Sequence, residues 1–172
     1  FEILGEVFLT DAIEQSTYVR EWGLPNQLDF PLYDAVARYA GGMSGAGGIE
    51  LRLADDDYVR TSNGLAPTPV TFVGNHDIGR TGLVIKGQMG ATGDELLQRV
   101  NLANSLLYLT RGAQIIYYGD EFGLIGSGGD KEARQDLEST QVSDWQRQER
   151  VGSAPIGTGS SFDVQNHPVG EH

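Results

Sequence analysis

The sequence predicts an α/β fold in which short parallel strands alternate with helices. Four apolar segments are rich in β-branched and aromatic residues and show little alternation, a pattern typical of parallel strands buried on both faces. Segments with helical periodicity lie between them. Each apolar segment also ends in an acidic residue, as at the carboxyl face of a (β/α)8 barrel.

The predicted strands each place an acid near the carboxyl end. They comprise 1–8 with Glu6, 26–30 with Asp29, 70–77 with Asp77, and 113–121 with Asp120 and Glu121. Because crossovers between parallel strands are right-handed, these carboxyl ends should meet at one edge of the sheet. A closed barrel needs about eight strand–helix units. The sequence therefore predicts a partial (β/α)8 TIM barrel, and its open edges require strands from outside this chain.

The strongest helical pattern covers 94–111. Its apolar stripe, with spacings of three and four residues, comprises Leu96, Val100, Ala103 and Leu107. Asp94 is the predicted N-cap, and Gly112 is predicted just beyond the C-terminal end.

Three shorter helices are predicted at 13–22, 32–40 and 49–59. The helix at 32–40 has Pro31 near its first turn and Gly41 after its end, and Asp29 before it is most simply an N-cap. The segment 122–172 has little periodicity and many small polar residues. We expect it to be mostly long loop.

Composition narrows the class of protein. The chain has 172 residues, 39% of them hydrophobic and 21% charged, which is typical of a globular domain. A formal charge of −12 would repel nucleic acid, so no such partner is expected. The chain lacks cysteine and the roughly 20-residue apolar run of a membrane span. We expect a soluble protein, either cytoplasmic or secreted to the periplasm or beyond. The start at Phe1, within an apolar run, suggests part of a longer chain.

Glu6 and Asp77 suggest glycoside hydrolysis, which uses a pair of carboxylic acids flanking the scissile bond. Glu6 follows an apolar strand and is flanked by Val7 and Phe8, and apolar surroundings raise the pKa of a general acid. Asp77 would supply a fixed anion beside a cationic transition state. His76 offers a ring N–H to a sugar hydroxyl.

The same residues also have structural interpretations. A Glu at the end of a strand is commonly solvated, and 75–77 could form an Asx-type turn held by its Asn. Asp120 and Glu121 could cap a loop, and Arg134 could pair with Asp136 or another loop acid. Four aromatic residues are more often found in a core than in a sugar platform: Trp22, Tyr33, Tyr117 and Tyr118.

The chain resembles the catalytic barrel of the α-amylase family of glycoside hydrolases, because several motifs occur in the order found in that family. "GEVF" (5–8) resembles the family's fifth-strand motif, "LPNQLDFPLYDAV" (24–36) its sixth-strand region, and "FVGNHD" (72–77) its seventh-strand motif. "GAQIIYYGDEFG" (112–123) resembles the eighth-strand segment, and "GGDKEARQDL" (128–137) the Arg-containing loop that follows it. The resemblance implies roughly strands five to eight with their helices, the C-terminal half of the barrel.

The resemblance also implies roles for single residues. Glu6 would be the general acid/base and Asp77 the transition-state stabiliser, while His76, Phe8 and Arg134 would bind substrate. The implied substrates are α-linked glucans such as starch, maltodextrin or related oligosaccharides, cleaved with retention of configuration. No cofactor or metal ligand is assigned within this chain. Calcium is expected only for the full-length enzyme, by resemblance.

One departure from the family pattern concerns the nucleophile. In the family it is an Asp within a Gly-x-Arg-x-Asp pattern on the fourth strand, and no such pattern occurs in this sequence. We therefore expect the nucleophile, with the N-terminal half of the barrel, outside this chain. The chain alone is expected to be inactive.

Two other functions fit parts of the pattern. A catalytically inactive relative could keep the barrel and bind glucans or serve as a transporter accessory subunit, although Glu6 and Asp77 are both present. "GNHD" (74–77) is also similar to a metal-binding motif of metallophosphoesterases. That family needs Gly-Asp pairs before this motif, and here they follow it, at 93–94, 119–120 and 129–130.

Overall fold

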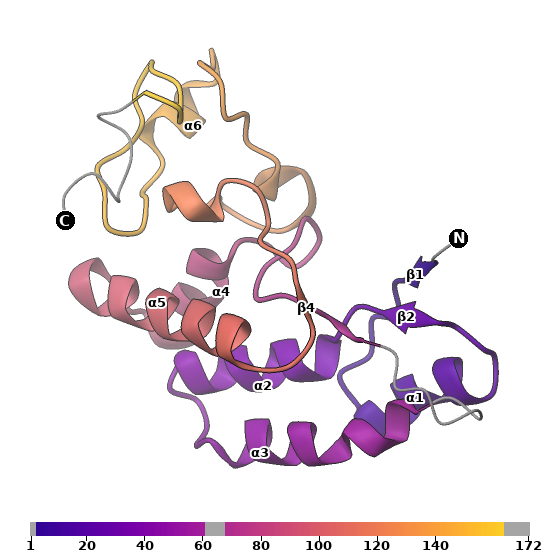
Figure 1. Cartoon of the computed structure of the whole chain (residues 1–172). Helices are drawn as coiled ribbons and strands as arrows, with labels where there is room; N and C mark the ends of the chain where they lie inside the picture. Colours follow the sequence, from indigo (N-terminus) through magenta and orange to yellow (C-terminus); the bar gives the residue numbers. More distant parts are fainter. Residues whose placement is uncertain (1–2, 61–67, 164–172) are drawn as a thin grey trace.

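Four short parallel strands alternate with helices in the computed structural model, which describes residues 3–60 and 68–163 (Figure 1). Strand β1 (Leu4–Gly5) pairs with β2 (Asn26–Gln27), and β3 (Val70–Thr71) pairs with β4 (Ala113–Gln114). A parallel bridge between Leu28 and Val70 joins the two pairs. The strands therefore follow the chain in the order β1-β2-β3-β4, and their carboxyl ends share one edge.

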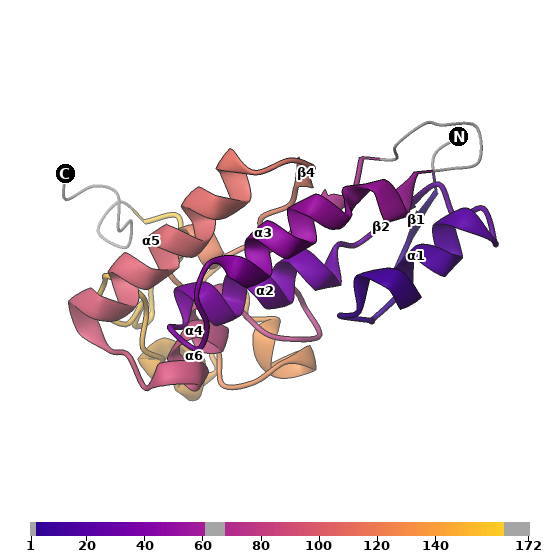
Figure 2. The same ribbon diagram turned by 90° about the horizontal axis from the view of Figure 1, so that it is seen from below.

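Helices separate consecutive strands, as the periodicity predicted, although the helix at Thr81–Met89 was not among the predicted ones. They are α1 (Ala12–Arg20) after β1; α2 (Phe30–Ala40), α3 (Gly47–Ala54) and the 3-10 helix η1 (Asp55–Val59) after β2; and α4 (Thr81–Met89) and α5 (Gly93–Leu109) after β3. Figure 2 shows α2 and α3 side by side, and the two helices are in contact. Of the described helices, none combines the length and the apolar character needed to cross a bilayer.

The segment after β4 is mostly loop with three short helices: η2 (Asp120–Phe122), η3 (Asp130–Ala133) and α6 (Ser143–Arg147). In Figure 1 it lies at the end of the molecule opposite β1. Ile125 and Val151 bring it into the core beside α4 and α5. Residues 164–172 of the predicted loop, and residues 1–2 of the first predicted strand, lie outside the described part of the chain.

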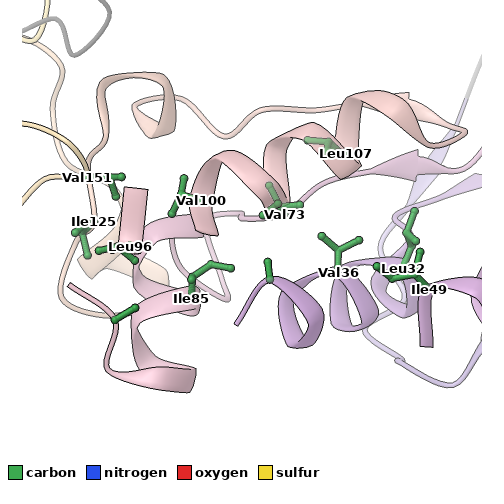
Figure 3. Close-up of a cluster of buried hydrophobic side chains, with 13 residues drawn as sticks. Leu32, Val36, Ile49, Val73, Ile85, Leu96, Val100, Leu107, Ile125 and Val151 are labelled. Carbon is green, nitrogen blue, oxygen red and sulfur yellow. The ribbon is translucent and has the colours of Figure 1, made fainter. Parts of the chain in front are cut away.

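The hydrophobic core lies between α2, α4, α5 and the strand exit at Val73 (Figure 3). The predicted stripe of α5 is confirmed, since all four of its members are buried: Leu96, Val100, Ala103 and Leu107. Leu32 and Val36 of α2 are buried opposite this stripe. Truncating such a buried leucine to alanine typically costs roughly 2–5 kcal/mol.

The prediction that the strands are buried on both faces is wrong for the outer two. Leu4 of β1 is 48% exposed and Ile115 after β4 is 43% exposed, whereas Phe72 after β3 is buried. Within the part of the chain that the structure describes, β1 and β4 have a neighbouring strand on one side only, which leaves their side chains uncovered. The ladders are also much shorter than predicted, because the chain leaves the sheet within two residues.

Three local predictions also need correction. α5 begins at Gly93 with Thr92 at the N-cap, so Asp94 lies inside the first turn. Trp22 is 69% exposed, because it follows the last turn of α1 and has its ring against Tyr18 rather than in the core. Tyr118, which was also expected in the core, is 40% exposed and contacts Tyr117 at the strand exit.

Candidate active site

Residues 75–79 form a closed turn immediately after β3. Asn75 and Gly79 exchange two backbone hydrogen bonds of 3.1 Å each. The Asn75 Oδ1 atom accepts hydrogen bonds from the backbone N–H groups of Asp77 (2.9 Å) and Ile78 (2.8 Å), which is an Asx turn. Gly79, with a φ of 100°, closes the turn in a conformation that favours glycine. Asn75 thus holds the turn, as predicted, and leaves His76 and Asp77 at its exposed tip.

The structure brings three of the predicted site residues together at this tip. The His76 Nε2 atom lies 3.3 Å from Asp77 Oδ1, and Arg134 Nη2 lies 3.6 Å from the same oxygen. Arg134 Nη2 also pairs with Asp130 Oδ1 at 2.7 Å. Between two fifths and half of each of the His76, Asp77 and Arg134 side chains is exposed. Asp77 is therefore an accessible carboxylate with an imidazole and a guanidinium beside it.

The loop that carries Arg134 lies directly against the turn. A Cβ atom added at Gly129 would be 2.0 Å from the Asp77 carbonyl oxygen, so no larger residue fits there without a shift of the backbone. A Cβ atom at Gly79 would be 3.2 Å from the Gly128 carbonyl oxygen. The predicted pairing of Arg134 with a loop acid is confirmed, but the acid is Asp130 rather than Asp136.

Glu6 and Phe8 lie at the same sheet edge, on the β1 side. Glu6 is exposed and follows the last residue of β1 directly. The apolar surroundings expected for it are not supplied by the described residues, because β1 is the outermost strand. Gly5 allows close approach of Leu24, since an added Cβ would be 2.6 Å from Leu24 Cδ2.

Phe8 is held at the rim by an aromatic cluster. Its ring centroid is 4.4 Å from that of Phe30, which in turn is 5.0 Å from that of Phe72. Phe30 and Phe72 are buried, and Tyr33 stacks on Phe72 at 5.3 Å. Phe8 is 59% exposed, so one face of a firmly supported ring remains accessible at the strand edge.

Arg80 has a structural role at this edge that the sequence did not predict. It is fully buried, donates from Nε to Gln135 Oε1 (2.7 Å) and from Nη1 to the Tyr118 carbonyl (2.5 Å), and pairs with Asp120 at 3.3 Å. Its guanidinium also lies over the Tyr117 ring, 4.9 Å from the centroid. Its position before α4 could have indicated a partner, because a cation at a helix N-terminus is unfavourable unless an anion lies beside it.

Asp120 connects the exit of β4 to the start of α4. Its Oδ2 atom accepts hydrogen bonds from the Thr81 N–H (3.1 Å) and hydroxyl (2.7 Å). Burial raises the pKa of Asp120, and the hydrogen bonds from Thr81 and the charge of Arg80 offset part of that rise. Asp120 thus caps the backbone N–H group of Thr81, as the alternative prediction of a loop cap proposed. Glu121 is also a cap and accepts a hydrogen bond from the Gly119 N–H.

Asp29 has a structural place as well. Its Oδ1 atom accepts the hydrogen bond of the Leu32 N–H at 3.0 Å, which confirms it as the N-cap of α2. Its carboxylate is buried and pairs with Arg52 (3.2 Å) and Arg111 (2.5 Å).

Within 3–60 and 68–163, no group of three or more His, Asp or Glu residues is arranged to hold a metal ion. Calcium in the full-length enzyme stays a prediction.

Comparison with known proteins identifies the family of this chain. A family model described as the α-amylase catalytic domain matches residues 1–154. The chain belongs to the α-amylase family. It is 38% identical over 165 residues to an α-amylase of Streptomyces lividans, covering 95% of this chain and 18% of that protein. It is 34% identical over 133 residues to a beta/alpha-amylase of Paenibacillus polymyxa, covering 77% and 10%.

Solved structures share the fold. The α-amylase of Geobacillus thermoleovorans, complexed with acarbose, matches 84% of this chain with a TM-score of 0.63 and 23% identity. An AmyP variant in complex with maltotriose matches 81% with a TM-score of 0.58 and 20% identity. This chain covers 30% and 28% of those two chains. Its four strands are thus part of an α-amylase-family (β/α)8 barrel, and the family argues against the metallophosphoesterase interpretation.

Proposed function

We propose that this chain forms roughly strands five to eight of an α-amylase-family barrel and supplies half of its active site. The whole enzyme would be a retaining glycoside hydrolase acting on α-linked glucans. The observation that carries this proposal is Asp77, an exposed carboxylate fixed by the Asx turn of Asn75 at the edge that also carries Glu6. Family membership supports the assignment of these two acids to glycosidic bond cleavage.

The first chemical step would break the bond between the anomeric carbon and the glycosidic oxygen. Glu6, in its protonated form, gives its proton to that oxygen, and the leaving sugar departs with a free hydroxyl group. A carboxylate on the missing part of the barrel forms an ester bond to the anomeric carbon. Asp77 is the fixed anion beside the positive charge that develops on the sugar ring.

The second step would release the bound sugar. Glu6, now a carboxylate, takes a proton from water while the water oxygen bonds to the anomeric carbon and the ester bond breaks. The nucleophile regains its negative charge and Glu6 regains its proton. Two inversions at the same carbon retain the α configuration.

The neighbouring residues have substrate-binding roles in this proposal. His76 would donate a hydrogen bond to a sugar hydroxyl beside Asp77, and its side chain is accessible for this purpose. Arg134, which reaches Asp77 from the following loop, would orient that carboxylate and contact the sugar. Phe8 would offer its exposed ring as a surface for a sugar on the other side of the scissile bond.

The substrate class is an inference from relatives. Two of the similar structures contain acarbose and maltotriose, and curated relatives are named amylases. The exposed acids and the supported aromatic rim suit a neutral, hydroxyl-rich ligand. We therefore favour starch, maltodextrins and related oligosaccharides.

The anomer released first by the full-length enzyme tests the proposed mechanism. Proton NMR of maltooligosaccharide hydrolysis should show the α anomer of the new reducing end before mutarotation sets in. Initial release of the β anomer would exclude retention. Glucan binding without any turnover would favour the inactive-relative alternative instead.

A further inference from the structure

One buried carboxamide connects the segments that follow β1 and β2. Gln15 lies on α1 and is 1% exposed. Its Nε2 atom donates hydrogen bonds to the carbonyl oxygens of Val7 (3.1 Å) and Leu28 (2.9 Å). Val7 is the residue after Glu6, and Leu28 forms the bridge to Val70 that joins the two strand pairs. The side chain therefore holds the Glu6 segment to the centre of the sheet.

The burial of Gln15 has a cost that an apolar residue would avoid. Burying an amide group without compensating hydrogen bonds is unfavourable by roughly 1–3 kcal/mol in proteins. The two donors are satisfied, but Oε1 finds no partner among the residues that the structure describes. A methionine of similar length would fill the same space. The polar residue is thus explained by the two carbonyl groups that it joins rather than by packing.

The hydrogen bonds of Gln15 limit the freedom of the Glu6 backbone on its C-terminal side. The Val7 carbonyl accepts from Gln15 and also from the Leu9 N–H at 2.8 Å, within a tight turn. On the N-terminal side, the Gly5 carbonyl accepts from the Leu28 N–H at 3.2 Å. Glu6 therefore lies between two backbone carbonyls that are both hydrogen-bonded, directly or through Gln15, to the end of β2.

We propose that Gln15 is a positioning residue for the general acid Glu6. The inference rests on the proposed function, because it assumes that Glu6 protonates the leaving group. Glu6 is exposed on an outer strand, so its backbone needs support from within the chain. A displacement of about 1 Å of a reacting group can cost on the order of 10²-fold in rate. Gln15 does not touch substrate and acts only through the Val7 carbonyl.

The test compares two substrates in the full-length enzyme. A maltooligosaccharide needs its leaving group protonated, whereas α-maltosyl fluoride releases fluoride without a proton. For Gln15→Met, we expect kcat/KM to fall by about 10–10²-fold for the oligosaccharide and by less than about threefold for the fluoride. The ratio of the two values is insensitive to the fraction of folded enzyme. Equal losses for both substrates, or no loss, would overturn the proposal.

Three matched variants complete the test. Ser16→Ala removes the hydrogen bond from a buried hydroxyl to Ile13 on the same helix and should leave the ratio unchanged. Gln15→Glu keeps the shape of the side chain with at most one hydrogen-bond donor, so it should show a smaller selective loss. If Gln15→Met does not fold, Gln15→Glu replaces it in the test. Glu6→Gln must show the largest selective loss. A selective loss in neither Glu6→Gln nor Gln15→Met refutes the proposed function, whereas a loss in Glu6→Gln alone refutes only the role of Gln15.

Discussion

Asn75 shows how one side chain determines the geometry of the turn that carries His76 and Asp77. Its Oδ1 atom accepts two backbone hydrogen bonds at the tip that carries Asp77. The sequence indicated this role, because Asn favours Asx turns. It did not indicate that Arg134 would reach the same tip, since the contact depends on a loop that lies more than fifty residues further along the chain.

We expect Asn75→Ala to loosen the turn. Loss of two hydrogen bonds, each contributing about 0.5–1.5 kcal/mol net, should destabilise the protein by roughly 1–3 kcal/mol. The displaced Asp77 should lower kcat by about 10–10²-fold. Thermal unfolding and steady-state kinetics measure the two effects.

Asn75→Asp is the control, because it keeps the acceptor oxygen. Its unfolding midpoint should stay close to that of the parent protein. Equal stability of the parent and Asn75→Ala would contradict the assigned role of the Asx turn.

Among the helices and strands, the long helix α5 could be predicted, whereas the helix α4 and the lengths of the strands could not. The stripe of α5 depends on local periodicity, which the sequence carries directly. Strand length depends on how many residues find a partner, and that is a property of the whole sheet. The Arg80 network escaped prediction for the same reason, because its partners Asp120 and Gln135 lie 40 and 55 residues away.

Arg80 connects β3, β4 and the following loop, so its removal should be costly. Arg80→Met leaves the buried Asp120 without its cation and should destabilise the fold by roughly 3–5 kcal/mol near neutral pH. Adding Asp120→Asn should recover part of this loss, because it removes the uncompensated charge. Urea unfolding of the parent, the single and the double variant measures the effect.

The pH dependence of Arg80→Met follows from the raised pKa of Asp120. Burial already raises this pKa above the value of the unfolded chain, so the native state holds the proton more tightly. Stability from this group is complete below the unfolded pKa and is lost as pH rises through the folded pKa. Loss of Arg80 raises the folded pKa further, so the variant should be less destabilised at pH 4 than at pH 7. An equal deficit at both pH values would contradict the assigned pairing.

For the whole molecule, the exposed outer strands β1 and β4 show where further strands of the barrel would pack against this chain. Leu4 of β1 and Ile115, directly after β4, are exposed apolar side chains. The order of the four strands and the acids at their shared edge could be predicted from the repeated strand–helix pattern. The prediction of apolar surroundings for Glu6 was wrong for the described residues, because Glu6 is exposed at the end of β1, which pairs with β2 alone among the described strands.

The purified 172-residue chain should not hydrolyse starch. The family's Gly-x-Arg-x-Asp pattern is absent from it, so no ester intermediate can form at that position. Release of reducing ends from soluble starch measures the activity. Turnover by this chain that disappears in Asp77→Asn would contradict the assignment of the nucleophile to another part of the barrel.

We propose that Glu6 is the general acid/base of the complete enzyme. The most direct measurement is kcat/KM of Glu6→Gln on a maltooligosaccharide in the full-length protein. The amide cannot give a proton to the glycosidic oxygen, so kcat/KM should fall by about 10²–10⁴-fold while the folded state is preserved. Activity within a few fold of the parent enzyme would remove Glu6 from this role.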